Sequence, residues 1–157
     1  MSWDFPQRAY LSMTDPEAKP KHRLAAIMAT DVVGYSKLMQ SDETAALAAL
    51  TEVRNATQQQ IELHQGRIAN TAGDSVLAEF GSAVEAVGCA MALQRQLTSQ
   101  EGKDLHLRIG VHLGDVVDKA GDLFGSAVNI AARLEGIAQP GGIVVSAAVR
   151  DAIAKKG

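Results

Sequence analysis

The feature that most limits the folds open to this chain is a strand hairpin placed between two helices. Residues 68–80 read IANTAGDSVLAEF, two short apolar runs on either side of the turn-forming segment TAGDS, a pattern typical of a hairpin. A long helix is expected before it, from Asp42 to Gln65 with a stop at Gly66, and a second helix after it, over residues 82–97. A hairpin in this position has to join a sheet whose other strands come from elsewhere in the chain.

Further strands are expected on both sides of this unit. The near-continuous apolar run LAAIMATDVVG at residues 24–34 predicts a strand buried on both faces, and LHLRIGVHLGDVVD at 105–118 predicts another that can bend at Gly114. A helix is expected to begin at Ser126, as its N-cap, and to end before Gly136, followed by a strand in GGIVVS and a last helix in AAVRDAIAKK. The order β-α-β-β-α-β predicts an α+β, ferredoxin-like core with a central antiparallel sheet flanked by helices and with appended strand and helix elements.

Length and composition favour one domain, because 46% of the 157 residues are hydrophobic. Residues 1–22, with three prolines, are expected to be an irregular leader, and residues 23–157 the folded domain. The formal charge is −3 and only 4% of residues are aromatic, so no nucleic-acid partner is expected. No apolar run reaches the roughly 20 residues of a membrane span. The single cysteine, Cys89, lies among apolar helix positions, which favours a reducing, cytoplasmic location.

Two aspartates are expected to meet at one end of the sheet. Asp31 stands near the C-terminal end of the first strand and Asp74 at the tip of the hairpin, and neighbouring strands lie about 4.8 Å apart. Two carboxylates there suit Mg²⁺ or Mn²⁺, and the turn VVGYS after Asp31 opens a short helix whose free N–H groups can hold phosphate. These groups favour phosphoryl chemistry on a nucleotide. From the spacing alone, a turn aspartate and a helix-capping aspartate explain the two residues equally well.

The helix expected from Ser126 carries an amide and a guanidinium on one face. Asn129 and Arg133 are four residues apart and lie among apolar neighbours, so they share a face. A guanidinium on a largely apolar helix is expected to meet an anion. Taken alone, this helix is explained more simply by an arginine that reaches the surface or pairs with Glu135.

Four segments, in order and at compatible spacing, resemble the class III nucleotidyl cyclase catalytic domain, the family of adenylate and guanylate cyclases. They are TDVVGYSKLM, GRIANTAGDSVLAEF, LRIGVHLGDVV and GDLFGSAVNIAARLEGIAQPGGIVVS, and the similarity runs from about Leu24 to the end of the chain. The resemblance implies that the domain converts ATP to 3′,5′-cyclic AMP and pyrophosphate. It also implies two Mg²⁺ or Mn²⁺ ions and a homodimer with two composite active sites.

The resemblance further implies roles for particular residues. In the implied reaction Arg133 neutralises charge on the α-phosphate and Asn129 orients the ribose, both from the partner subunit. The implied metal ligands are Asp31, Asp74 and the carbonyl of Val32, the implied catalytic residues are Asn129 and Arg133, and the implied substrate-binding residues are Asn70, Asp122, Val33, Gly34, Tyr35 and Ser36.

Two departures from the family pattern bear on these roles. Asn70 stands where adenylate cyclases usually carry a lysine, and the family's triphosphate-binding lysine would lie beyond Gly157, so C-terminal strands are expected to be missing. The alternatives to an adenylate cyclase are a guanylate cyclase, a regulatory cyclase-like module that binds nucleotide without turnover, and another palm-type enzyme such as a diguanylate cyclase or polymerase. The last of these would share the two carboxylates but has no use for the helix that carries Asn129 and Arg133.

Overall fold

The computed structural model describes residues 21–98 and 105–156. The irregular leader expected over residues 1–22 lies outside the described residues except at Lys21 and His22. These two residues belong to the first strand rather than to a leader, because they pair with Asp118 and Val117 of a later strand.

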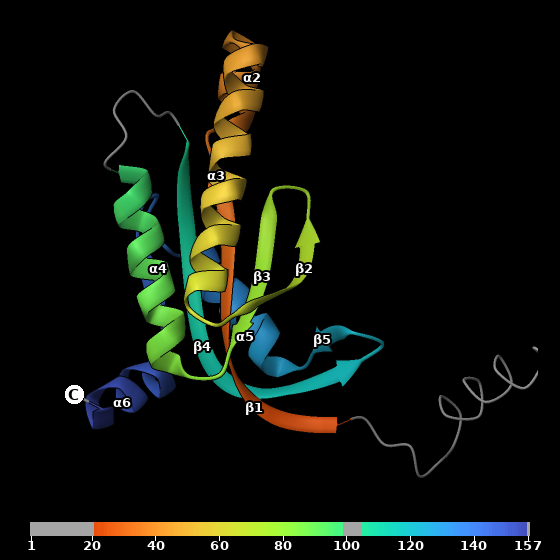
Figure 1. Ribbon diagram of the computed structural model, residues 1–157, viewed down its shortest axis with the longest axis vertical. Helices are drawn as coiled ribbons and strands as arrows, with labels where there is room; N and C mark the ends of the chain where they lie inside the picture. Colours follow the sequence, from red (N-terminus) through yellow and green to blue (C-terminus); the bar gives the residue numbers. More distant parts are fainter. Residues whose placement is uncertain (1–20, 99–104, 157) are drawn as a thin grey trace, which may run out of the picture.

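A six-stranded sheet forms the centre of the molecule (Figure 1). Its order is β2-β3-β1-β4-β5, so the first strand lies in the middle beside the hairpin. All pairs are antiparallel except that of β6, which runs parallel to β4. The strands are β1 (Lys21–Val33), β2 (Arg67–Ala72), β3 (Ser75–Phe80), β4 (His106–Lys119), β5 (Asp122–Phe124) and β6 (Ile143–Val145).

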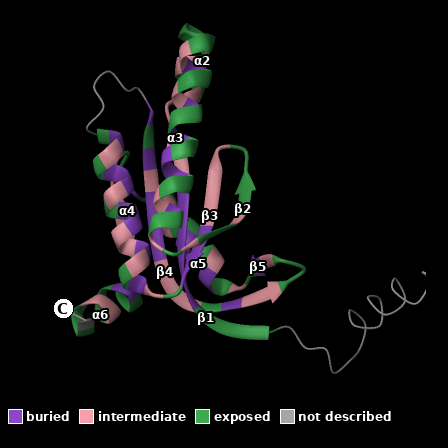
Figure 2. Cartoon of the chain, in the orientation of Figure 1, coloured by how far each residue is buried: buried purple, intermediate pink, exposed green. Residues whose placement is uncertain are grey.

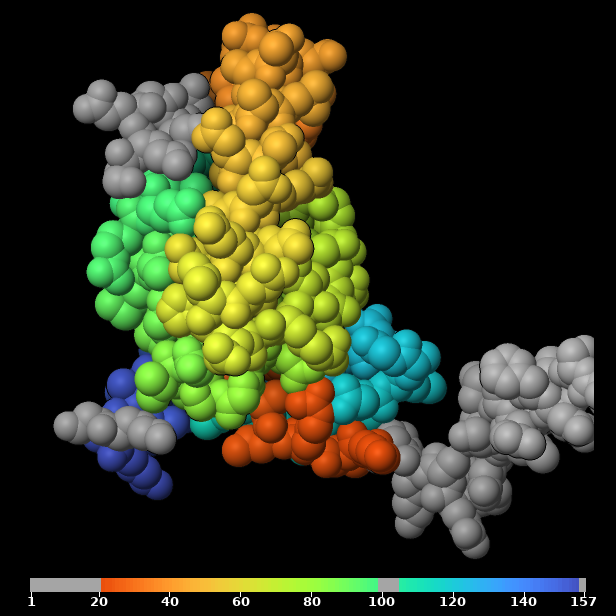
Figure 3. All heavy atoms as spheres, viewed as in Figure 1, coloured from red at the N-terminus to blue at the C-terminus, as the bar shows by residue number. Residues whose placement is uncertain are grey.

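Helices cover both faces of this sheet, and the predicted α+β class with a central sheet flanked by helices is confirmed. Helices α3 and α4 lie over one face, which is the face toward the viewer in Figure 3, whereas α5 packs on the other. The helices are α2 (Tyr35–Ser41), α3 (Glu43–Leu63), α4 (Ala83–Thr98), α5 (Ser126–Gly136) and α6 (Ala147–Lys156).

The helix boundaries differ from the expected ones at two glycine-containing turns. Ser126 is the first residue of α5 rather than its N-cap, which is Gly125. Gly125 has a φ of 118° and packs against β4, where a Cβ would lie 3.2 Å from the carbonyl oxygen of Asp115. Helix α3 ends at Leu63, before the predicted Gln65, and Gln65 itself takes the left-handed conformation.

The core divides into two parts because successive side chains of β1 point to opposite faces of the sheet. Ala26 and Met28 pack with α3, α4 and α6, whereas Ile27 and Ala29 pack with α5. Figure 2 shows the buried residues concentrated along the central strands and the helix faces turned toward them. Cys89 is fully buried on α4, and burial raises the pKa of its thiol to about 12. It is therefore a core residue.

An ion network ties four strands together on the α5 side of the sheet. The buried Glu79 of β3 pairs with Arg23 of β1 and Arg67 of β2, and Arg23 also donates to Asp118 of β4 at 2.6 Å. The hydrogen bond from Arg23 is the main cause of a lowered pKa at Glu79. This network fixes the relative positions of β1 to β4 at their ends remote from Asp31.

No helix of residues 21–98 and 105–156 combines the length and the apolar character that crossing a membrane would require. The cytoplasmic location expected from the sequence stays a prediction.

Candidate active site

The structure brings Asp31 and Asp74 together at one end of the sheet. Asp31 lies near the end of β1, and its Oδ1 accepts hydrogen bonds from the backbone N–H of Val32 at 3.0 Å and from Ser75 Oγ at 3.1 Å. Asp74 lies in the turn between β2 and β3, directly after Gly73, which has a φ of 61°. Burial and then the neighbouring Asp31 raise the pKa of the Asp74 carboxyl. Two half-buried carboxylates therefore lie close enough to repel each other.

This pair of carboxylates fits a hard divalent cation. Their mutual repulsion is relieved when a cation binds between them, and carboxylate and carbonyl oxygens are the ligands that Mg²⁺ and Mn²⁺ prefer. Across the described part of the chain, no group of three or more His, Cys, Asp or Glu side chains could hold a metal. Ligands beyond the two carboxylates would therefore come from backbone carbonyls such as that of Val32, from water or from substrate phosphates.

The turn after Asp31 has the form expected of a phosphate-binding loop. Val33 ends β1, Gly34 is the N-cap of α2 with a φ of 99°, and no side chain caps this helix end. The first N–H groups of a helix lack partners inside the helix, so those of Tyr35 and Ser36 are available to a ligand. The Tyr35 side chain packs against the core, so only its backbone is suited to such a contact.

A cavity of about 240 Å³ borders this turn. It is lined by Gly34, Lys37, Leu38 and Ser41. Lys37 therefore adds a positive charge beside the turn, which the sequence reasoning did not single out.

Asn129 and Arg133 lie on the exposed side of α5, whereas Ala127 and Ala131 on its inner side are buried against the sheet. Within the described residues neither polar side chain makes a hydrogen bond or an ion pair, so the alternative pairing of Arg133 with Glu135 is absent there. Both side chains are therefore available to another molecule. Their catalytic roles stay predictions.

Asn70 and Asp122, two of the implied substrate-binding residues and the two that the cyclase resemblance assigns to purine recognition, lie on strands that meet. Asn70 of β2 lines a cavity of about 180 Å³ between the hairpin and α5, together with Ser75, Leu77 and Glu135. Asp122 begins β5, and its Oδ1 accepts from the N–H of Leu123 at 2.8 Å. Although β2 and β5 are at opposite ends of the sheet order, they contact each other because the sheet curls (Figure 1).

Sequence reasoning missed three side chains next to Asp31. Ser75 donates to its carboxylate. Arg108 is its direct neighbour in the β1–β4 register, and the buried Arg108 Nε has no hydrogen-bond partner within the described residues. Glu135 is the third. Burial raises the pKa of its carboxyl, the negative charge of Asp31 raises this pKa further, and the positive charge of Arg108 lowers it. These contacts depend on the register between strands, which cannot be predicted from a local sequence motif.

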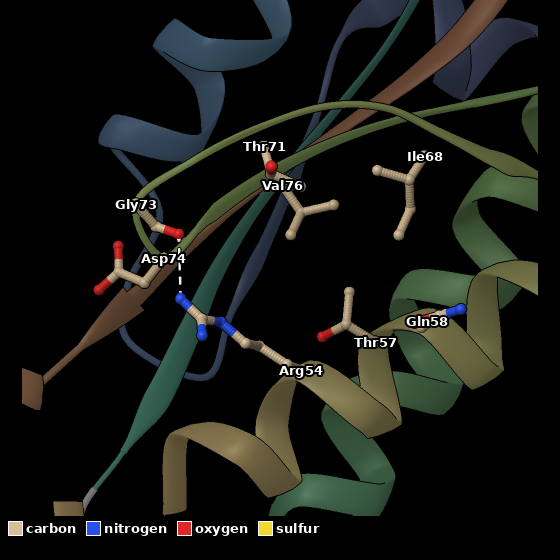
Figure 4. Close-up of a pocket in the computed structure, with 8 residues that line it drawn as sticks. All are labelled: Arg54, Thr57, Gln58, Ile68, Thr71, Gly73, Asp74 and Val76. Atoms are coloured by element: carbon tan, nitrogen blue, oxygen red, sulfur yellow. Dashed lines mark hydrogen bonds between the residues drawn. The ribbon is translucent and has the colours of Figure 1, made fainter. Parts of the chain in front are cut away.

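A third cavity lies behind the hairpin, between it and α3 (Figure 4). Its volume is about 210 Å³. Arg54 of α3 crosses it, and its Nη2 donates to the carbonyl oxygen of Gly73 at 3.2 Å. The lining residues are Arg54, Thr57, Gln58, Ile68, Thr71, Gly73, Asp74 and Val76.

Known proteins with similar sequences identify the family of this chain. The model of the adenylate and guanylate cyclase catalytic domain matches residues 17–157. A protein of Rhizobium meliloti (strain 1021) named "Putative adenylate cyclase 3" is 44% identical over 137 residues, which cover 83% of this chain and 23% of that protein. An adenylate cyclase of Streptomyces coelicolor is 33% identical over 135 residues, 85% of this chain and 35% of that protein.

A solved structure agrees with these relatives. The crystal structure of an adenylate/guanylate cyclase/hydrolase from Silicibacter pomeroyi superposes with a TM-score of 0.77 at 38% sequence identity, covering 88% of this chain and 84% of that one. The chain belongs to the adenylate and guanylate cyclase catalytic domain family. It spans 23% and 35% of the length of the two curated relatives.

Proposed function

We propose that this domain is an adenylate cyclase that converts ATP to 3′,5′-cyclic AMP and pyrophosphate. The observation that carries the proposal is the close pair Asp31 and Asp74 beside an uncapped helix start, in a chain that belongs to the cyclase family. The names of the two curated relatives support a cyclase that acts on ATP.

Each group has a defined part in this reaction. The ribose 3′-hydroxyl releases its proton as its oxygen attacks the α-phosphorus, and the bond from that phosphorus to the oxygen that bridges the α- and β-phosphates breaks as pyrophosphate leaves. Two Mg²⁺ or Mn²⁺ ions bound at the site would lower the pKa of the 3′-hydroxyl and neutralise charge on the triphosphate. Asp31, Asp74 and the carbonyl of Val32 would hold these ions. The N–H groups of the turn from Val33 to Ser36 would donate to phosphate oxygens.

The exposed face of α5 supports a composite site. Arg133 is suited to neutralise charge on the α-phosphate and Asn129 to orient the ribose, but both side chains face solvent on their own chain. In a homodimer with two-fold symmetry, the exposed face of α5 in each subunit would lie beside Asp31 and Asp74 of the other subunit. We therefore propose two composite sites, each with metal ligands from one subunit and the Asn129–Arg133 pair from its partner.

Base selection would rest mainly on Asp122. A carboxylate only accepts hydrogen bonds, so it suits the N6 amino group of adenine and repels the O6 of guanine. Asn70 can donate to adenine N1, but its amide can also turn its oxygen toward a donor, so it discriminates less than a lysine would. The preference for ATP over GTP is expected to be worth one or two hydrogen bonds, about 1–3 kcal/mol.

The test is to incubate the protein with ATP or GTP in the presence of Mn²⁺ and to identify the product by mass spectrometry. Cyclic AMP is expected, and Asp122→Ala is expected to erode the preference for ATP far more than Asn70→Ala. A protein that binds ATP but forms no cyclic nucleotide would instead be a regulatory module. A wild type that prefers GTP, or a preference that neither substitution changes, would contradict the assignment of the base-reading residues.

A further inference from the structure

The turn that carries Asp74 is held from the helix side by Arg54. This arginine lies on the exposed side of α3, and its Nη2 reaches across the cavity behind the hairpin to the carbonyl oxygen of Gly73 (Figure 4). Gly73 takes the left-handed conformation immediately before Asp74. The hydrogen bond therefore fixes the peptide unit that joins Gly73 to the carboxylate-bearing residue.

The turn needs such a contact because the strand leading into it is weakly held. Nearly all of β2 is exposed, and its pairing with β3 is interrupted by a register shift between Ile68 and Asn70. Exposed edge strands with an irregular ladder open more easily than central strands. On the sheet side the tip is tied by Ser75, which donates to Asp31. On the opposite side, Arg54 of α3 binds the turn through the carbonyl oxygen of Gly73.

The geometry of this contact leaves the Asp74 carboxylate free. Arg54 bonds to a backbone carbonyl and not to the carboxylate, and Figure 4 shows the Asp74 carboxylate pointing away from the guanidinium. A direct ion pair between the two side chains would occupy the oxygens that a metal requires. A bond to the preceding carbonyl instead orients the residue without using its ligand atoms, which is how groups behind the ligands commonly tune a metal site.

We propose that Arg54 is a positioning residue that holds Asp74 in its metal-binding orientation and thereby sets the affinity of the site for Mn²⁺ or Mg²⁺. This inference rests on the proposed function, since it requires that Asp31 and Asp74 bind a divalent cation.

The experiment measures Mn²⁺ binding to the full chain without nucleotide, by the loss of the electron paramagnetic resonance signal of free Mn²⁺. Arg54→Gln removes the charge and shortens the side chain, and it is expected to raise the Mn²⁺ dissociation constant about tenfold. Arg54→Lys, which keeps the charge and one possible donor, is expected to lose less. The matched control is Arg95→Gln on α4, an exposed residue that does not line this cavity, and its affinity is expected to equal that of the wild type.

Asp74→Asn separates failure of the inference from failure of the proposed function. If Asp74→Asn abolishes binding but Arg54→Gln binds Mn²⁺ as the wild type does, the positioning role is wrong and the metal site stands. If the wild type does not bind Mn²⁺, or Asp74→Asn binds equally well, the metal site is wrong and the inference fails with it. Thermal unfolding of every variant is recorded, and a loss of affinity that only matches the fraction of unfolded protein overturns the positioning role.

Discussion

Among single residues, Asp74 destabilises the metal-free fold when its carboxyl is ionised. Burial and the charge of Asp31 raise the pKa of its carboxyl in the folded state. A raised pKa means that the folded protein binds a proton there more readily than the unfolded chain does. Without metal, the contribution of the protonated Asp74 carboxyl to the free energy of unfolding is therefore fully present below the ordinary pKa of an aspartate. It is lost as the pH rises through the raised pKa. The conflict disappears when a cation neutralises the pair.

Asp74→Asn should consequently make the metal-free protein more stable while abolishing cyclase activity. In the presence of a chelator at pH 7, a gain of about 1 kcal/mol would raise the melting temperature by about 2–4 °C. Circular dichroism during heating measures this change, and Asp151→Asn on the exposed part of α6 serves as the control. A lower melting temperature for Asp74→Asn, or activity equal to that of the wild type, would contradict the metal-ligand role.

Among the elements, α5 depends on close contact with β4 at Gly110. A Cβ at this position would overlap the backbone of α5 at Ala131 and Glu135 and would lie 2.9 Å from the carbonyl carbon of Leu134. The backbone of α5 cannot move aside without leaving the sheet, because Ala131 is fully buried. The glycine therefore sets the position of the helix that carries Asn129 and Arg133.

Gly110→Ala is expected to lower the free energy of unfolding by about 1–3 kcal/mol and to reduce cyclase activity more than the loss of folded protein explains. The control is Gly136→Ala in α5 itself, where the added Cβ would meet no neighbouring element within 4 Å, and it should be neutral or slightly stabilising. Denaturant unfolding and activity per folded molecule provide the two measurements. Equal stability of the two variants would show that α5 is not packed as described.

The ion network around Glu79 gives the sheet a dependence on acid pH. The pKa of the Glu79 carboxyl is lowered in the folded state. Its contribution to the free energy of unfolding is therefore fully present above the ordinary glutamate pKa of 4.5 and is lost as the pH falls through the lowered pKa. Glu79→Gln should lower stability at pH 7 by about 1–3 kcal/mol and flatten the loss of stability below pH 4.5. Melting curves at several pH values test this, and an unchanged acid profile would refute it.

Much of this architecture could be predicted from local sequence patterns. The period of apolar residues located the helices, and the turn residues in TAGDS located the hairpin that carries Asp74. The contacts of Arg54, Arg108 and Glu135 could not be predicted in the same way. They depend on strand register and on how a helix lies across a sheet, and those are set by packing between distant segments.

At the scale of the whole molecule, the proposed division of each site between two subunits would allow two inactive variants to complement each other. Asp31→Ala removes a proposed metal ligand, whereas Arg133→Ala removes the group that the partner subunit is proposed to contribute. Mixing the two proteins with subunit exchange should form heterodimers with one intact site, giving about a quarter of the wild-type activity when exchange is random. Asp31→Ala mixed with Asp74→Ala should recover nothing, since both changes affect the same half of the site. Equal recovery in both mixtures, or none in the first, would argue against composite sites.

The central place of β1 in the sheet also governs how the molecule is assembled during synthesis. This strand is made first among the described elements, yet its neighbours β3 and β4 come later, and Arg23 bonds to Asp118 across 95 positions of the chain. Contacts of such wide sequence separation slow folding. Until β4 has left the ribosome, the apolar strand β1 has one edge without a partner, and a nascent chain in that state is prone to aggregate. The central position of β1, which carries the proposed metal ligand Asp31 near its end, thus leaves the nascent chain exposed to aggregation until β4 has been made.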